Sequence, residues 1–181
     1  MRLFFALPLP PAIQRDLAAL RRDLGKARWV PAPQLHLTLR FLGEVDDDTA
    51  TRVIEAVREE RERAPWALPP LRARGIGTFG GRKPRVLFAG VTPREPAEAV
   101  AASIERAVVG VGLAPEARPF AAHITLARFA RPDLDRITAF LRDEATFATE
   151  PFEVPEAILY RSKLTPSGAL HEPLHRFAIP K

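Results

Sequence analysis

The sequence repeats one four-residue pattern, His36-Leu37-Thr38-Leu39 and His123-Ile124-Thr125-Leu126, and the two histidines are 87 residues apart (residue 36 to residue 123). Each copy alternates polar and apolar residues, which is the period of a half-buried strand. Residues i and i+2 of a strand point to the same face, so each copy presents an imidazole beside a hydroxyl. The repeat therefore predicts two related halves, each contributing one His–Thr pair to a shared groove.

The segments around the two copies alternate between strand-like and helix-like patterns, which favours an α/β or α+β fold. Strands are expected at 3–7, 35–42, 72–79, 85–92, 120–129, 152–164 and 170–179. Helices are expected at 10–24, after the three aspartates at 46–48, at 96–109 and at 134–146. No long linker divides the chain. We expect an α+β protein that forms a single domain over residues 1–181, with two pseudo-symmetric lobes around a central groove. Each lobe is expected to hold an antiparallel-rich sheet with helices on its outer face.

The composition limits the class of protein. Apolar residues make up 46% and charged residues 27% of the 181 positions, as in a globular domain. Cysteine is absent, which excludes disulfides, a thiolate nucleophile and Cys-ligated metal sites. The apolar run at 3–13 is interrupted by prolines and is too short to span a membrane. We expect no membrane partner, no secretion signal and a cytoplasmic location.

The charge balance points to an anionic partner. Lys plus Arg total 27 against 22 for Asp plus Glu, and the net charge of +5 is modest for a dedicated nucleic-acid-binding protein. Only four of the cations are lysine, asparagine is absent and prolines number 19. A heat-adapted source explains the preference for arginine and proline and the lack of asparagine. A GC-rich genome explains the arginine and proline content equally well, so both interpretations stay open.

Two imidazoles and two hydroxyls suit one type of chemistry. A lone histidine among leucines is more often a structural sheet residue, but here two of the four histidines share one local pattern. One imidazole can take a proton from water while the other gives one to a leaving oxygen. The threonine hydroxyls can donate hydrogen bonds to non-bridging oxygens. This set suits the cleavage of a phosphodiester, in which in-line attack and departure require the acid and the base on opposite sides of phosphorus. Because the two pairs look alike, the pattern alone does not say which histidine is the acid.

Five segments extend the two motifs in a fixed order. They are MRLFFAL (1–7), HLTLRFLGEV (36–45), PRVLFAG (84–90), RPF (118–120) leading into HITLAR (123–128), and LYRSKL (159–164) with Gly168. With these segments the chain resembles the two-histidine phosphoesterase superfamily and, within it, the RNA 2′,3′-cyclic phosphodiesterases, also called 2′–5′ RNA ligases. The resemblance covers nearly the whole chain.

The resemblance implies hydrolysis of a terminal 2′,3′-cyclic phosphate of RNA to a 2′-phosphate, without a metal or nucleotide cofactor, by a chain that we expect to be a monomer. It implies that His36 is the acid, His123 the base, and Thr38 and Thr125 the phosphate anchors. It also makes Arg128 a phosphate-binding candidate. Strict alternation places Arg128 on the opposite face from His123, so Arg128 reaches the groove only if the strand bends near position 127.

The chain departs from the family pattern at two positions. Ala122 precedes the second histidine, where the family usually has proline, and His171 stands where a tyrosine is common. Because His171 stands in place of that tyrosine, the resemblance does not decide whether this position makes a peripheral contact with the substrate.

Two alternatives to hydrolysis remain. One is ATP-independent 2′–5′ ligation of RNA, which is the same chemistry in reverse. The other is a non-catalytic module that binds RNA ends.

The pattern Gly75-x-Gly77-x-x-Gly80 matches a dinucleotide fingerprint, but no helix pattern follows it, so a hairpin turn is expected. We expect Phe41 to pack in the core, whereas Tyr160 is a candidate for stacking on a base.

Overall fold

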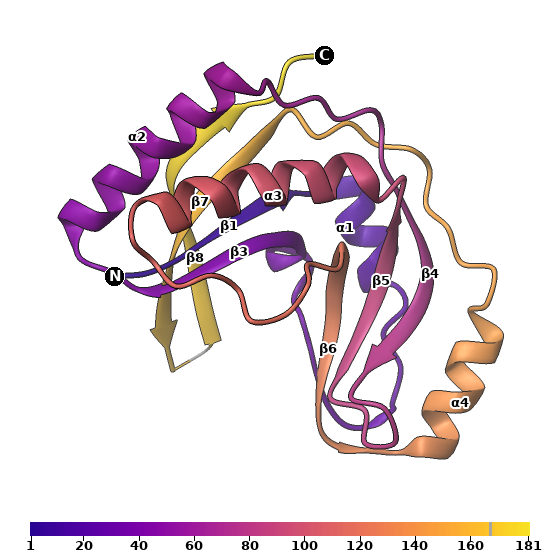
Figure 1. Cartoon of the computed structure of the whole chain (residues 1–181). Coiled ribbons are helices and arrows are strands. Elements are labelled where there is room, and N and C mark those ends of the chain that lie inside the picture. The colour runs from indigo at the N-terminus through magenta and orange to yellow at the C-terminus, as the bar shows by residue number, and fades with distance from the viewer. Residues whose placement is uncertain (167) are drawn as a thin grey trace.

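One antiparallel sheet runs through the molecule in the strand order β4-β5-β6-β3-β1-β7-β8, with β2 paired to β6 (Figure 1). The computed structural model describes residues 1–166 and 168–181; the turn predicted at 166–168 includes Ser167, which lies outside the described residues. The strands are β1 (Arg2–Pro8), β2 (Gly25–Trp29), β3 (His36–Glu44), β4 (Arg72–Phe79), β5 (Val86–Thr92), β6 (His123–Pro132), β7 (Glu156–Thr165) and β8 (Gly168–Ala178). The helices are α1 (Pro11–Ala18), the 3-10 turn η1 (Ala32–Gln34), α2 (Asp47–Arg63), α3 (Glu95–Gly110) and α4 (Leu134–Asp143).

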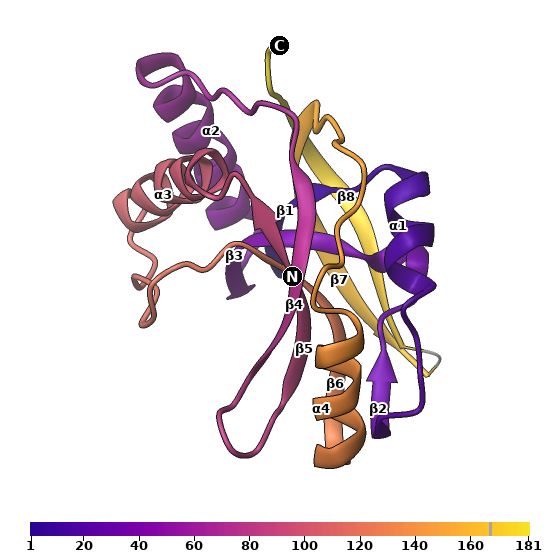
Figure 2. The same ribbon diagram turned by 90° about the vertical axis from the view of Figure 1, so that its right-hand side faces the viewer.

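The expected α+β fold is confirmed, and the two lobes join along a narrow seam. One lobe holds β4, β5, β6 and β2, and the other holds β3, β1, β7 and β8. The lobes meet where β3 and β6 pair through one register position, Leu37 opposite Ile124. Helices α2 and α3 lie together along one side of β1 and β3, and α1 lies on the other side (Figure 2). Both strands of the seam begin at the histidine of their motif.

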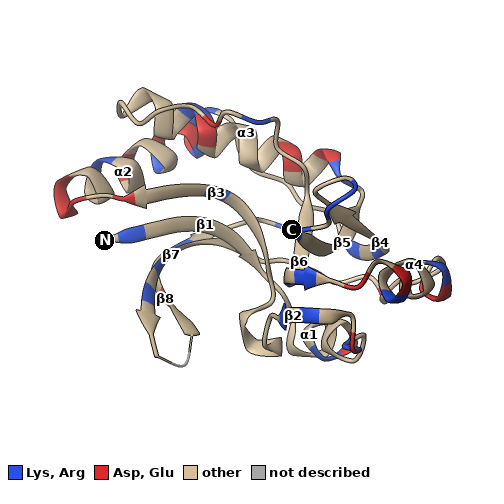
Figure 3. Ribbon diagram, turned by 90° about the horizontal axis from the view of Figure 1, so that it is seen from below, with Lys and Arg blue, Asp and Glu red and all other residues tan. Residues whose placement is uncertain are grey.

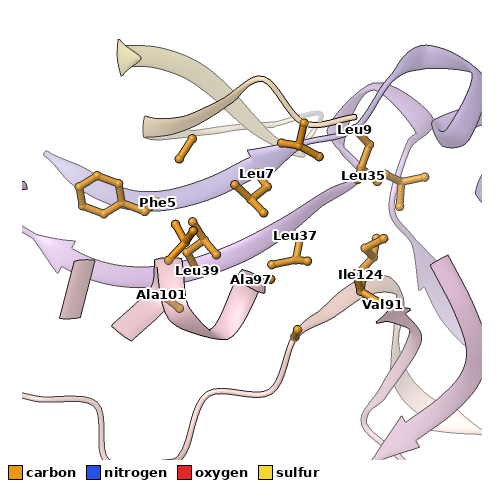
Figure 4. Packing of buried hydrophobic residues seen from close by; sticks show 14 of the residues in the cluster. Phe5, Leu7, Leu9, Leu35, Leu37, Leu39, Val91, Ala97, Ala101 and Ile124 are labelled. Carbon is orange, nitrogen blue, oxygen red and sulfur yellow. The ribbon is translucent and has the colours of Figure 1, made fainter. Parts of the chain in front are cut away.

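The backs of the two motifs form part of the core. Leu37, Leu39, Ile124 and Leu126 are each at most 4% exposed. Leu37 and Leu39 point from β3 toward Ala97 and Ala101 of α3 (Figure 4). Alanines at this contact let the helix approach the sheet closely, so the apolar face of the first motif is fixed by packing while its polar face stays open.

A buried arginine ties α3 and the loop after it to the same strand. Arg40 is 8% exposed, and its guanidinium contacts the carboxylates of Glu105 and Glu116 and donates to the carbonyl oxygen of Ala114. A buried charge is tolerated only when it is paired in this way. These contacts hold the segment that leads into β6 against β3.

The first helix is shorter than the sequence pattern predicts. It ends at Ala18, although Leu20 and Leu24 of the same apolar stripe are still buried. The chain then forms β2, which the sequence analysis does not predict. Its first residue, Gly25, has a φ of +91°, and a Cβ there would lie 2.7 Å from the carbonyl oxygen of Arg131. Glycine at this position allows β2 to approach β6.

Candidate active site

The pairing of β3 with β6 sets the positions of both His–Thr pairs. In an antiparallel pair with Leu37 opposite Ile124, His36 stands next to Thr125, and Thr38 stands next to His123. All four side chains leave the same face of the sheet, because they flank the paired residues. The two imidazoles therefore occupy opposite corners of a four-residue arrangement, and the two hydroxyls occupy the other corners.

A groove with two compartments lies over these corners. The first compartment, of about 520 Å³, contains His36, and the second, of about 450 Å³, contains His123. Both compartments are lined by Thr38, Phe41, Thr125 and Arg128, so these residues lie at the junction. This central groove brings together all five residues that the sequence analysis singles out.

Arg128 reaches the groove because β6 changes face within the motif. Across β5 and β6, Leu87 opposes Ala127 while the next residue, Phe88, opposes Thr125, so Leu126 has no partner in the register. Such a bulge puts two consecutive residues on the buried face, after which the alternation resumes in the opposite phase. Leu126 and Ala127 are both buried, and Arg128 is exposed beyond them. The bend that the sequence analysis required therefore exists.

The same bulge occurs in β3 and corrects the expectation for Phe41. In the register of β1 with β3, Phe5 opposes Arg40 and Ala6 opposes Thr38, which leaves Leu39 unpaired. Phe41 consequently turns to the groove and is 49% exposed, so its predicted place in the core is wrong. Phe41 and Arg128 are equivalent positions of the two motifs, one apolar and one cationic.

Both imidazoles are held by the backbone in the same way. The Nδ1 atom of His36 donates to the carbonyl oxygen of Gln34 at 2.6 Å, and Nδ1 of His123 donates to that of Ala121 at 2.7 Å. A carbonyl oxygen can only accept, so the proton of each neutral ring is on Nδ1 and Nε2 carries a lone pair. At His36 this Nε2 accepts from the hydroxyl of Thr38 at 3.0 Å.

The surroundings of both rings favour the neutral form. Burial lowers the pKa of His36 from 6.5 to about 4, against the raising effect of its hydrogen bond to Gln34, and the positive charges of His171, His123 and Arg128 lower the pKa further. Burial also lowers the pKa of His123, and the charge of Arg128 adds to that effect. Both histidines are therefore neutral at pH 7 in the free protein, with Nε2 ready to accept a proton.

Aromatic rings produce much of this burial. The ring of Phe4 lies 5.2 Å from that of His36 and 4.8 Å from that of His171. The rings of Phe79 and Phe88 lie 4.9 Å and 5.8 Å from that of His123. Each histidine thus has an apolar wall on its own side of the groove.

The glycine-rich stretch at the end of β4 and after it is structural. A Cβ on Gly77 would lie 2.7 Å from the ring of Phe88, so glycine makes room for the phenylalanine that packs against His123. Gly80 and Gly81 form the turn between β4 and β5, both with positive φ. The predicted hairpin is confirmed, and no helix starts there.

The charges differ between the two compartments of the groove. The compartment of His36 is lined by Arg2 and Arg128 and by no acidic side chain among the described residues, whereas the compartment of His123 is lined by three glutamates and three arginines, namely Glu98, Glu105, Glu116, Arg40, Arg118 and Arg128. Seen from below, Lys and Arg bands lie on β1, β2, β6 and the β7–β8 hairpin, and the helices carry both basic and acidic bands (Figure 3). Arg128 forms no ion pair with any described residue, so its guanidinium is available to an anion. Within the described part of the chain there is no cluster of three or more His, Asp or Glu residues suited to hold a metal ion. No helix in that part is long and apolar enough to cross a membrane.

Four more residues line the groove that the sequence analysis does not predict as site residues. Arg2, Gln34, Ser162 and His171 line the compartment of His36. Three of them lie on strands outside either motif, and His171 was noted only as a departure from the family pattern. Only the pairing of β1, β7 and β8 brings those three to the groove, and no local sequence signal carries that information.

Comparison with known proteins gives a consistent result. The family model described as LigT like phosphoesterase matches residues 7–88 and 91–171. A protein of Thermus thermophilus named RNA 2′,3′-cyclic phosphodiesterase is 33% identical over 189 residues, which cover 99% of this chain and 90% of that protein. A Geobacillus stearothermophilus protein of the same name is 30% identical over 167 residues, and the matched part spans 52% of its length.

Solved structures agree over nearly the whole chain. The crystal structure of TT0787 of Thermus thermophilus matches with a TM-score of 0.75 and 28% identity, covering 99% of this chain and 98% of that one. The crystal structure of Escherichia coli LigT complexed with 3′-AMP matches with a TM-score of 0.73 and 27% identity over the same shares.

The ionisation of His36 can be measured directly. We expect the imidazole of His36 to titrate near pH 4 in an NMR experiment on the free protein, because burial disfavours its charged form. In the unfolded chain the same ring titrates near 6.5, so this group makes the folded protein lose stability as the pH falls from about 6.5 toward 4. Saturation with a 2′-phosphate nucleotide should raise the midpoint, because an anion favours imidazolium. A midpoint near 6.5 in the free protein contradicts the burial of His36.

Proposed function

The chain belongs to the LigT-like phosphoesterase family, and from this membership and its groove we propose that it hydrolyses the terminal 2′,3′-cyclic phosphate of RNA to a 2′-phosphomonoester. The observation that carries the proposal is the antiparallel pairing at Leu37 and Ile124, which sets His36 and His123 on opposite sides of one groove. Relatives named RNA 2′,3′-cyclic phosphodiesterase support the choice of substrate.

The phosphate binds at the junction of the two compartments. The hydroxyls of Thr38 and Thr125 donate to its non-bridging oxygens, and the guanidinium of Arg128 supplies a positive charge. These three residues line both compartments, so an anion held by them lies between the two imidazoles. Developing negative charge on the phosphorus oxygens is stabilised by these donors.

Two proton transfers then complete the reaction. The Nε2 atom of His123 takes a proton from a water molecule as the water oxygen bonds to phosphorus. The bond from phosphorus to O3′ breaks on the opposite side, and O3′ receives a proton from Nε2 of His36. The products are a 2′-phosphate and a free 3′-hydroxyl. One proton has moved to His123 and one has left His36, and exchange with solvent restores both rings.

Substrate binding prepares the acid. At neutral pH the free ring of His36 has no proton on Nε2, since its pKa is about 4. The negative charge of the bound phosphate raises this pKa, so His36 is loaded with a proton when the substrate arrives. A proton on Nε2 also ends the hydrogen bond that this atom accepts from Thr38. The hydroxyl proton of Thr38 then becomes free to face the phosphate.

The proposal extends to the organisation of the protein. All groups used above come from residues 1–181 of one chain, so we propose a single two-lobed domain that acts as a monomer. We propose that its partner is RNA with a cyclic phosphate end and that the reaction takes place in the cytoplasm. We propose that it needs no metal ion and no nucleotide cofactor, because proton transfer and hydrogen bonding account for each step.

The reaction is tested with a short RNA that ends in a 2′,3′-cyclic phosphate, incubated with the protein in excess EDTA. We expect a 2′-phosphate product at the rate seen without EDTA, since no step uses a metal ion. Loss of activity in EDTA that a divalent ion restores contradicts the mechanism. A 3′-phosphate product contradicts the assignment of O3′ as the leaving oxygen. Joining to an added RNA with a 5′-hydroxyl end measures the reverse, 2′–5′ ligation.

The roles of the two histidines are tested by substitution. In His36→Gln and His123→Gln we expect kcat to fall about 10²–10⁴-fold, the usual contribution of a general acid or base. The affinity for a 2′-phosphate nucleotide should change much less, because the phosphate anchors remain. The matched control is His175→Gln, whose ring packs against Phe177 at 4.6 Å and does not line the groove. Unchanged kcat in the first two variants would falsify the mechanism, and wild-type binding of RNA ends without turnover would indicate a binding module.

A further inference from the structure

We propose that Arg2, Ser162 and His171 form a second phosphate-binding subsite, which binds the phosphodiester on the 5′ side of the terminal nucleotide. This subsite, the outer row, rests on the proposed function and adds a preference for oligonucleotides over single nucleotides. Nothing in the motifs of β3 and β6 contributes to it.

The register of three neighbouring strands aligns the outer row. Arg2 of β1 opposes Ser162 of β7, and Ser162 opposes His171 of β8. Residues that oppose one another in this way share a face of the sheet. All three line the compartment that contains His36. The outer row therefore crosses three strands beside the catalytic corner.

The polar groups of the outer row have no protein partners. Within residues 1–166 and 168–181, none of the three side chains forms a hydrogen bond or an ion pair. The carboxylates that stand near them in the register are occupied by other groups. Glu44, which opposes Arg2, pairs with the amino group of Met1 at 3.4 Å, and Glu172 pairs with Lys163 at 2.8 Å. One guanidinium, one hydroxyl and one imidazole thus remain for a ligand, and together they match a phosphate diester.

The outer row is in contact with the proposed acid, His36, through the ring of His171. The rings of His171 and His36 are 5.4 Å apart in a T-shaped contact, and both rest on Phe4. Since His36 protonates the leaving O3′, the ribose lies on the His36 side of the phosphate. The rest of the RNA continues from that ribose, away from His123 and its water. The next phosphate therefore falls on the side of Arg2, Ser162 and His171.

The charges that face the subsite favour an anion. Arg2 projects from β1, His36 and Arg128 lie on the neighbouring elements that line the same cavity, and Ser162 on β7 is uncharged at neutral pH. No acidic side chain is among the described residues that line this compartment. A phosphodiester placed here gains an ion pair with Arg2, and the nearest carboxylate in the register, that of Glu44, is paired with the amino group of Met1.

The test compares three substrates that share the same reacting end. They are cytidine 2′,3′-cyclic phosphate, the dinucleotide ApC with a 2′,3′-cyclic phosphate end, and that dinucleotide with an uncharged methylphosphonate linkage. For the wild type we expect kcat/KM to be about tenfold higher with the charged dinucleotide than with either of the others, the usual effect of one charge-assisted contact. In Arg2→Gln and Ser162→Ala that advantage should shrink, while kcat/KM for the mononucleotide stays within about twofold.

The matched control is Arg161→Gln, which removes a positive charge from the opposite face of the same strand as Ser162. It should keep the full preference for the charged dinucleotide. Equal kcat/KM for charged and methylphosphonate dinucleotides in the wild type overturns the subsite, and so does an equal loss on all three substrates in the Arg2 and Ser162 variants. If no substrate is turned over, the proposed function fails. The subsite is then judged by calorimetry, as the difference in Kd between ApC 2′-phosphate and its methylphosphonate analogue, and no difference overturns it.

Discussion

The backbone pairing of Leu37 with Ile124 is the contact on which the groove depends. Two strands from separate lobes meet there over a single register position, and their antiparallel direction places each histidine beside the threonine of the other motif. A shift of one residue would turn every polar side chain of one motif into the core. The burial of the intervening aliphatic residues under α3 makes such a shift costly. Core packing in this protein therefore fixes the distance and the direction between two imidazoles.

The second constraint is electrostatic. Aromatic walls around His36 and His123 partly shield both rings from water, and the cationic Arg128 beside them disfavours any further positive charge. The free groove thus holds two neutral bases and an unpaired guanidinium. A phosphate anion reverses this balance, because it pairs with the guanidinium and stabilises imidazolium. The protein links the loading of its acid to the arrival of the ligand, and this requires no change of fold.

Much of this arrangement could be predicted from the alternation of His-x-Thr-Leu, since period-2 patterning specifies which side chains share a face. The alternation could not specify the bulges at Leu39 and Leu126, because a bulge depends on which strand pairs alongside. The sequence pattern consequently predicts a core position for Phe41, which is wrong, and it predicts that Arg128 reaches the groove only if β6 bends. Strand β2 was missed for a similar reason: it is a short, mostly exposed strand whose partner, β6, is distant in the sequence. Long-range pairing brings Arg2 and His171 to the groove, and no local pattern records it.

The central claim is that the two imidazoles contact one phosphate from opposite sides. A crystal structure with a bound 2′-phosphate nucleotide tests it most directly. The account predicts that Nε2 of His36 and Nε2 of His123 each lie at hydrogen-bond distance, about 2.7–3.2 Å, from different oxygens of the same phosphorus. A phosphate that contacts only one of the two rings, or that binds outside the junction lined by Thr38 and Thr125, would contradict it.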